Sequence, residues 1–179
     1  MRDEIKETLF EPIEIDIRVR ELGQLISRDY KNHYPLVVGI LKGSFIFVAD
    51  LIRNISERCQ VDFMAVSSYG SGTKTTGKIK ITKDLSVPIE GRDVILVDDI
   101  LDSGNTISCI REMLRVRNPA SIRIAVLLDK PSRREVPISA DYVGFAIPDK
   151  FVVGYGLDYD DKYRNLRGIK VLRPEVYNK

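Results

Sequence analysis

Mostly apolar runs alternate with amphipathic segments through the middle of the chain. The runs predict strands over residues 36–41, 61–67, 94–97 and 122–128. Continuous apolar runs are typical of strands that are buried on both faces of a parallel sheet. Apolar residues at helical spacing predict helices over 17–30, 44–57 and 104–119. Asp16 is the expected N-cap of the first helix.

This alternation predicts an α/β fold, with a doubly wound and mainly parallel sheet flanked by helices. Shorter extended pieces are expected around 142–147, 151–154 and 169–172. We expect the N-terminal and C-terminal segments to form a small hood subdomain beside the sheet. The 179 residues fit one domain over 1–179. Residues 70–78 hold three glycines and almost no apolar side chains, which predicts a mobile loop.

Composition and charge narrow the class of protein. Lys and Arg number 28 against 26 Asp and Glu, so charge alone does not indicate a nucleic-acid partner. No apolar stretch approaches the roughly 18 residues of a membrane helix, and no signal peptide is evident at the N-terminus. Cys59 and Cys109 are isolated thiols outside any CxxC spacing, which favours a reducing, cytoplasmic location and small buried side chains.

The single histidine limits the chemistry further. His33 lies in a polar connector, so a zinc site of Cys and His is nearly excluded. Any metal is expected to be a hard, oxygen-ligated ion such as Mg²⁺. Acid–base chemistry then falls to carboxylates or lysines.

The segment from Val94 to Thr106 carries the strongest chemical signal. Its apolar strand runs into Asp98 and Asp99, at the end of a strand where α/β sheets bind ligands. Ser103-Gly104-Asn105-Thr106 follows at a helix start, where free N–H groups and the helix dipole favour an anion. A sugar phosphate would suit this segment, because its hydroxyls can bind the two acids and its phosphate can bind the helix start. The ordinary interpretation is a strand that ends in solvent, followed by a capped helix. Neither a P-loop nor a GxGxxG pattern is present.

This segment resembles the phosphoribosyl-pyrophosphate signature of type I phosphoribosyltransferases. Other motifs resemble the hypoxanthine (hypoxanthine-guanine) branch of that family, between residues 41 and 166. They are Leu41-Lys42-Gly43-Ser44 (pyrophosphate loop), Ser67-Ser68-Tyr69-Gly70 (start of the flexible catalytic loop), Asp129-Lys130-Pro131, the purine hood from Ile147 to Tyr159, and Tyr163-Arg164-Asn165-Leu166.

The resemblance implies a purine-salvage enzyme, a hypoxanthine phosphoribosyltransferase. It would move the 5-phosphoribosyl group from phosphoribosyl pyrophosphate to hypoxanthine or guanine, giving IMP or GMP and pyrophosphate. Asp102 would be the general base, with a helix N-cap as its ordinary alternative. The ribose and 5′-phosphate would be held by Asp98, Asp99, Asp102, Ser103, Gly104, Asn105 and Thr106. Pyrophosphate would be held by Lys42, Gly43, Ser68, Tyr69 and Arg164.

The same resemblance assigns the base and the metal. The purine would be bound by Lys130, Phe151, Val152 and Asp158, with Lys130 donating to the 6-oxygen and Phe151 stacking on the ring. Mg²⁺ would be held by Asp98, Asp99 and Asp158. The family more often has Glu at the position of Asp98, so its contact is either direct or through water. The peptide bond before Lys42 can be cis in the family.

Ordinary structural interpretations stand beside these roles. Lys42 and Arg164 can be solvated, Phe151 can be a core residue, and residues 158–161 can be a solvated acidic loop. Arg133 and Arg134 are expected to be solvated surface. A nucleotide-responsive RNA-binding regulator on the same fold is the alternative function, whereas a pyrimidine or adenine phosphoribosyltransferase is disfavoured by Lys130 and the hood motif. The family association suggests a homodimer or homotetramer and no membrane partner.

Overall fold

The computed structural model describes residues 2–68 and 79–178. Its strands are β1 (Ile5–Phe10), β2 (Leu36–Leu41), β3 (Gln60–Ser68), β4 (Ile79–Lys83), β5 (Asp93–Leu101), β6 (Ser121–Asp129), β7 (Tyr142–Ala146), β8 (Val152–Val153) and β9 (Ile169–Leu172). Its α-helices are α1 (Pro12–Asp29), α2 (Phe45–Arg53), α3 (Asn105–Arg115) and α4 (Pro174–Tyr177). Within these residues, no helix is both long and apolar enough to cross a membrane.

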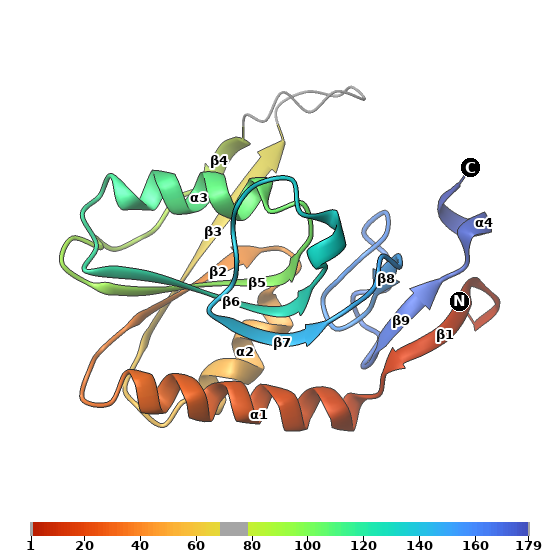
Figure 1. The fold of residues 1–179 in the computed structure, drawn as a ribbon, viewed down its shortest axis with the longest axis horizontal. Helices are drawn as coiled ribbons and strands as arrows, with labels where there is room; N and C mark the ends of the chain where they lie inside the picture. Colours follow the sequence, from red (N-terminus) through yellow and green to blue (C-terminus); the bar gives the residue numbers. More distant parts are fainter. Residues whose placement is uncertain (1, 69–78, 179) are drawn as a thin grey trace.

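The main sheet has six strands in the order β4-β3-β2-β5-β6-β7 (Figure 1). All neighbours are parallel except β4, which runs antiparallel to β3 at one edge. Because successive side chains of a strand point to opposite faces, the apolar strands feed two separate hydrophobic clusters. Val37 of β2 packs with α1 and α2, whereas Leu36 and Val38 pack with α3 on the other face. The predicted doubly wound fold is confirmed.

Several element boundaries differ from the sequence prediction; α2, for example, ends at Arg53 rather than at residue 57. Helix α1 begins at Pro12 rather than residue 17. Glu11 is its N-cap, and the Glu14 carboxylate accepts a hydrogen bond from the Glu11 N–H at 2.8 Å, so Asp16 lies inside the helix. Proline is favoured in the first helical turn because its missing N–H costs nothing there. Strand β5 continues through both acids to Leu101, because it stays paired with β6 as far as Asp129.

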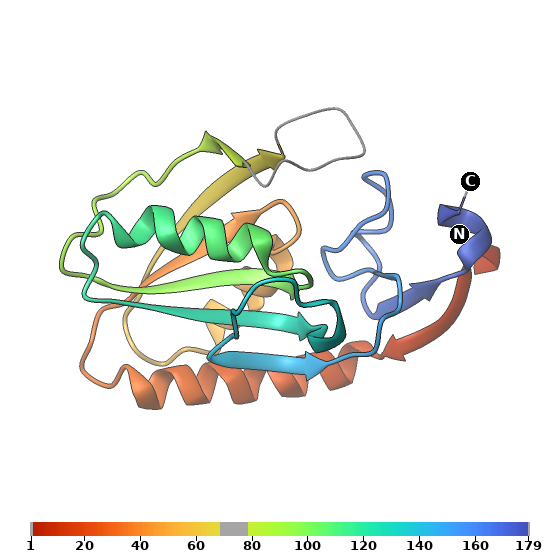
Figure 2. The same cartoon turned by 45° about the horizontal axis from the view of Figure 1, so that its top comes forward.

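The second sheet forms the hood, which is defined here as β1, α4 and the chain from residue 147 to residue 172, with β8 and β9 in it. Its strands are antiparallel in the order β1-β9-β8. Both ends of the described chain therefore lie side by side at the hood (Figure 2). The extended piece at 142–146 does not belong to it, because β7 pairs in parallel with β6 and closes the main sheet.

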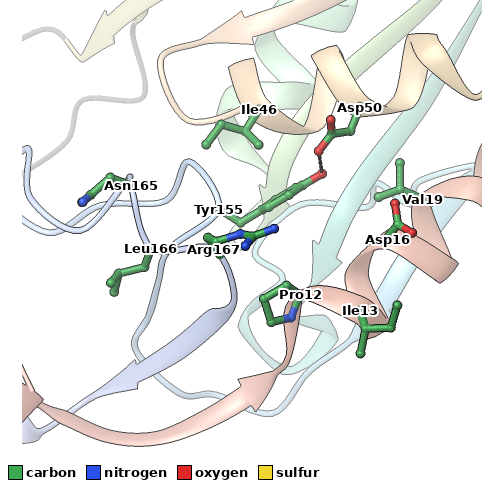
Figure 3. A pocket seen from close by; sticks show the side chains of 10 residues that line it. All are labelled: Pro12, Ile13, Asp16, Val19, Ile46, Asp50, Tyr155, Asn165, Leu166 and Arg167. Carbon is green, nitrogen blue, oxygen red and sulfur yellow. Dashed lines mark hydrogen bonds between the residues drawn. The ribbon is translucent and has the colours of Figure 1, made fainter.

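A part-buried hydrogen bond ties the hood to the helical layer of the main domain. The Tyr155 hydroxyl donates to Asp50 of α2 at 2.7 Å (Figure 3). Burial and the adjacent Asp50 raise the pKa of Tyr155 far above its usual range, so the phenol stays protonated. The two residues line a cavity of about 500 Å³ together with Asp16 of α1 and Arg167. The hood is thus held at a fixed place over one end of the sheet.

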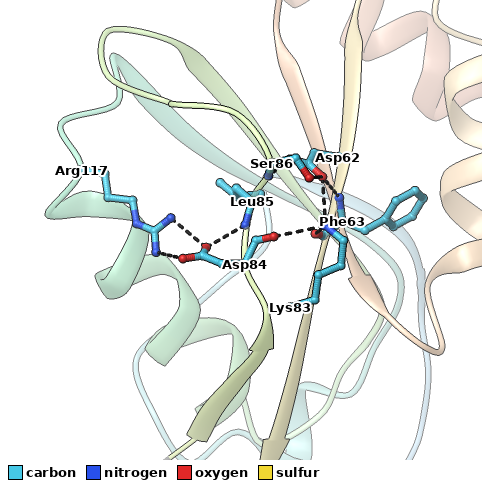
Figure 4. A network of polar contacts seen from close by, with 7 residues as sticks. All are labelled: Asp62, Phe63, Lys83, Asp84, Leu85, Ser86 and Arg117. Carbon is cyan, nitrogen blue, oxygen red and sulfur yellow. Dashed lines mark hydrogen bonds and ion pairs between the residues drawn. The ribbon is translucent and has the colours of Figure 1, made fainter.

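A polar network fastens β4 and the chain that follows it (Figure 4). Asp62 of β3 accepts the N–H groups of Ser86 at 2.6 Å and Phe63 at 2.8 Å, and it pairs with Lys83 at 3.3 Å. Burial raises the pKa of Asp62, but these donors outweigh burial and lower it overall. The network therefore fastens the end of β4, and the chain that leads from it to β5, to the neighbouring strand β3.

Candidate active site

The predicted site residues gather where parallel strands of the main sheet end beneath the hood. The last residues of β2, β5 and β6 are Leu41, Leu101 and Asp129. In Figure 2 the arrows of β6 and β7 point toward the hood. Ligands of open α/β sheets bind at this carboxyl edge. The topology therefore brings three motifs that are distant in sequence to one place.

The loop after β5 forms a small cavity of about 240 Å³ at the start of α3. The residues that line it include the acids and the loop of the signature: Asp98, Asp99, Asp102, Ser103, Gly104 and Thr106. Gly104 caps α3 with a φ of 87°, and a Cβ there would lie 2.5 Å from the Ile138 side chain. Only glycine fits this turn. Helix N–H groups and hydroxyls facing one small cavity suit an anion such as a phosphate.

Asn105 of the predicted phosphate loop has a different partner in the structure. Its side-chain amide donates to Glu135 at 2.5 Å, and the main-chain N–H of Glu135 donates to the Ser103 carbonyl at 2.9 Å. Asn105 is also absent from the residues that line the cavity. Its side chain therefore fixes the outer side of the loop and does not face the cavity.

Asp98 and Asp99 form a close carboxylate pair at the floor of this cavity. Burial raises the pKa of both groups, and the neighbouring Asp99 raises that of Asp98 further. The Asp99 carboxylate lies directly over Gly43, where an added Cβ would be 1.8 Å from Oδ2. Strand β5 and the loop after β2 thus meet without any intervening side chain. A pair of this kind is stabilised in its ionised form by a cation.

The loop after β2 contacts the hood. The Leu41–Lys42 peptide bond is cis, as the resemblance implies. Gly156 of the hood, with a φ of 102°, abuts the Gly43 carbonyl so closely that a Cβ would lie 2.1 Å from the oxygen. The Lys42 ammonium reaches Asp161 at 3.3 Å.

Arg164 links this loop to the acids of the hood. Its guanidinium donates to the Gly156 carbonyl at 2.8 Å. It also pairs with Asp158 at 2.8 Å and with Asp161 at 3.0 Å. Asp158 and Arg164 are therefore partners of each other, rather than a solvated acid and a surface arginine.

A second cavity of about 460 Å³ lies between the hood and the ends of β5 and β6. Its lining includes all four predicted purine residues: Lys130, Phe151, Val152 and Asp158. The Lys130 side chain is only 8% exposed, and its ammonium lies 3.6 Å from the Asp102 carboxylate. Asp102 lines this cavity as well as the smaller one. It stands where the two cavities meet.

The expectation of solvated surface is wrong for Arg134 but holds for Arg133, whose side chain is 53% exposed. Arg134 is largely buried, pairs with Asp129, and donates to the carbonyls of Leu101 and Asp102. Arg133 reaches Asp102 at 3.3 Å and Asp149 at 3.6 Å across the mouth of the larger cavity. Their position in the sequence was the available signal, since both arginines lie within four residues of Lys130, just after the end of β6.

Tyr177 of α4 is another residue of this site that the sequence did not indicate. It lines the larger cavity, and its ring stacks on that of Phe151.

Cys59 and Cys109, which were expected to be buried, are half-buried.

Some predictions fall on parts that the structure does not describe. Tyr69 and the predicted loop 70–78 lie outside the described residues, and Ser68 is the last residue of β3. Within residues 2–68 and 79–178, no group of three or more His, Cys, Asp or Glu side chains gathers as a metal site. The Asp98–Asp99 pair and Asp158 thus present at most two carboxylates together.

Known proteins match this chain over nearly its full length. Residues 7–160 match the phosphoribosyl transferase domain family. A hypoxanthine-guanine phosphoribosyltransferase of Bacillus subtilis is 50% identical over 99% of this chain and 98% of its own length. A crystal structure of a hypoxanthine phosphoribosyltransferase from Staphylococcus aureus superposes with a TM-score of 0.96 at 48% identity, covering 100% of this chain and 97% of that one.

A longer relative matches the same residues. The bifunctional protein TilS/HprT of Listeria innocua is 47% identical over 99% of this chain. The chain spans 28% of that relative's length.

Proposed function

The chain belongs to the phosphoribosyl transferase domain family, and on that premise we propose that it transfers the 5-phosphoribosyl group of phosphoribosyl pyrophosphate to hypoxanthine or guanine. The products are IMP or GMP and pyrophosphate. The observation that carries the proposal is the position of Asp102 between a phosphate-sized cavity and a larger one lined by Lys130 and Phe151. A sugar phosphate and a planar base placed in these cavities meet at this carboxylate.

Asp102 acts as the base in this reaction. A purine nitrogen bonds to C1′ of the sugar as the bond from C1′ to pyrophosphate breaks, and the purine loses a proton to the Asp102 carboxylate. Lys130 donates a hydrogen bond to the 6-oxygen and thereby orients the ring toward C1′. Its buried ammonium lies 3.6 Å from the Asp102 carboxylate, so the two groups also hold each other in place.

The leaving pyrophosphate is held at the other end of the sugar. Arg164 and Lys42 supply positive charge, and the main-chain N–H of Gly43 supplies a donor on the loop under the hood. These cations are pre-positioned by their acidic partners Asp158 and Asp161. Charge that develops on a leaving group is best stabilised by groups that are already in place. Ser68 and Tyr69 are proposed to complete this subsite.

Mg²⁺ fits the acids at this site. Mg²⁺ binds through one or two carboxylates together with substrate oxygens and water, and the crowded Asp98–Asp99 pair offers such a set. Asp98 and Asp99 would hold it beside the ribose, and Asp158 would hold a second ion. When bound, the cation neutralises charge on the pyrophosphate. We also propose that the protein is cytoplasmic and that it forms a homodimer or homotetramer. Sedimentation tests the oligomeric state.

One assay tests the activity. Purified protein is incubated with phosphoribosyl pyrophosphate and Mg²⁺, and each of hypoxanthine, guanine, xanthine and adenine is offered in turn. We expect hypoxanthine and guanine to react, xanthine to react poorly, and adenine to be rejected because its amino group would face the Lys130 donor. Adenine reacting as fast as hypoxanthine would contradict the proposal. RNA retention without nucleotide formation would instead favour the regulator, which the comparisons do not favour.

A further inference from the structure

Phe151 in the hood does not stand alone. Its ring is stacked on Tyr177 of α4, with centroids 4.5 Å apart and planes 18° apart. The Tyr159 ring lies nearly perpendicular to the same ring, with centroids 5.5 Å apart and planes 89° apart. Stacked and edge-to-face pairs at these distances are the favoured aromatic geometries. Two neighbouring rings therefore fix the plane of Phe151.

Both stacked rings also line the larger cavity. A planar base sandwiched between Phe151 and Tyr177 would need the rings about 7 Å apart, since each layer takes about 3.5 Å. The observed separation of 4.5 Å leaves no such space. Tyr177 therefore covers one face of Phe151, and a base can stack only on the other.

Helix α4 is held in place by main-chain contacts close to Phe151. The N–H of Leu172, at the end of β9, donates to the Phe151 carbonyl at 3.0 Å. The N–H of Arg173 donates to the Glu4 carbonyl at 2.9 Å, on the approach to β1. Phe151, Tyr159, Val176 and Tyr177 all pack on one small hydrophobic cluster of the hood. The chain that leads into α4 is thus anchored on both sides, and this fixes the position of the Tyr177 ring.

We propose that Tyr177 is a positioning residue for the purine, which acts by holding the Phe151 ring in the plane on which the base stacks. The proposal rests on the proposed function. Without the tyrosine ring, Phe151 loses its stacked neighbour and can rotate out of that plane. Binding of the base is then weakened by the entropic cost of reordering the ring. Binding of phosphoribosyl pyrophosphate, which occupies a different part of the site, is unaffected.

The test compares three variants by steady-state kinetics with both substrates. Tyr177→Ala is expected to raise KM for hypoxanthine about 2- to 13-fold, which is the range that one aromatic pair supplies. KM for phosphoribosyl pyrophosphate stays within about twofold. Tyr177→Phe keeps the ring and restores the wild-type KM for hypoxanthine. Val176→Ala is the matched control, because it trims the same helix and cluster without touching the stacked pair.

Each outcome is decisive. An unchanged KM for hypoxanthine in Tyr177→Ala overturns the proposal. A lowered KM also overturns it, because the tyrosine would then obstruct the base. Equal losses for both substrates, or the same loss in Val176→Ala, would show that α4 acts only on stability. If Tyr177→Ala does not fold, Tyr177→Leu takes its place. A wild-type protein without activity toward hypoxanthine would instead refute the proposed function.

Discussion

Replacing Lys130 with methionine isolates what the buried ammonium does. Methionine has nearly the same length but no donor and no charge. Lys130 is 8% exposed, and its carboxylate neighbour Asp102 lies 3.6 Å away. A hydrogen bond to a charged group is worth about 1.5–3 kcal/mol. We therefore expect kcat/KM for hypoxanthine to fall about 10- to 150-fold.

Adenine responds in the opposite direction. In the wild type, its 6-amino group meets the ammonium donor, so we expect adenine to be used at least about 100-fold less efficiently than hypoxanthine. In Lys130→Met the conflict disappears, and the two bases should come within about tenfold of each other. The melting temperature should not fall, because the variant removes a buried charge and leaves Asp102, which is 40% exposed, to water.

The assay is initial-rate kinetics with both bases at saturating phosphoribosyl pyrophosphate. Lys150→Met is the matched control, since Lys150 pairs with Glu7 of the hood at 2.7 Å and does not line the cavity. A loss below about threefold for hypoxanthine would refute the reasoning. So would an equal loss for both bases, because it would show that Lys130 acts on the sugar or on Asp102 alone.

Three further predictions follow from the geometry. Asp102→Asn should lower kcat about 10²- to 10⁴-fold with little change in phosphoribosyl pyrophosphate binding, and a loss below about threefold would remove Asp102 from the role of base. Gly156→Ala, whose Cβ would lie 2.1 Å from the Gly43 carbonyl oxygen, should lower kcat/KM for phosphoribosyl pyrophosphate at least about tenfold, while Gly91→Ala, also at positive φ but in open space, should not. Asp62→Asn forces an amide donor against an N–H donor and should lower the melting temperature by about 4–8 °C. The pKa of Asp62 is lowered in the folded state, so its stabilisation is present above the unfolded value of 3.8 and is lost as pH falls below it. The gap between wild type and Asp62→Asn in thermal melts should therefore narrow below about pH 4, and a constant gap would contradict this.

The sequence predicted the sheet because its signal is local. Strands such as β2 and β6 are apolar on both faces, which only a sheet covered on both sides accommodates. The predicted cradle at Gly104 also follows from a short segment, since strand, turn and helix are adjacent in sequence. The strands of the main sheet and the turn at Gly104 can therefore be predicted without knowing which distant segments are in contact.

The parts that the sequence did not reveal depend on contacts between distant segments. Apart from its position just after β6, nothing in the local sequence distinguishes Arg134 from a surface arginine. Its contacts with the carbonyls of Leu101 and Asp102 form only when β6 pairs with β5. Tyr177 reaches Phe151 only because β8 and β9 pair. The start of α1 was missed for a different reason: the capping pair of Glu11 and Glu14 lies outside the apolar repeat that marks the helix.

The pairing of β1 with β9, in which Ile5 lies opposite Leu172, has a consequence for the order of folding. Closing so long a loop is entropically unfavourable, so contacts of this kind form late. The parallel sheet and the turn at Gly104 depend on shorter separations and can assemble first. A chain growing on the ribosome would thus form the loop at Gly104, which we propose binds phosphate, well before the cavity that we propose for the base. Substitutions that weaken β1 or β9 should yield molecules that retain this loop while the larger cavity is still unformed.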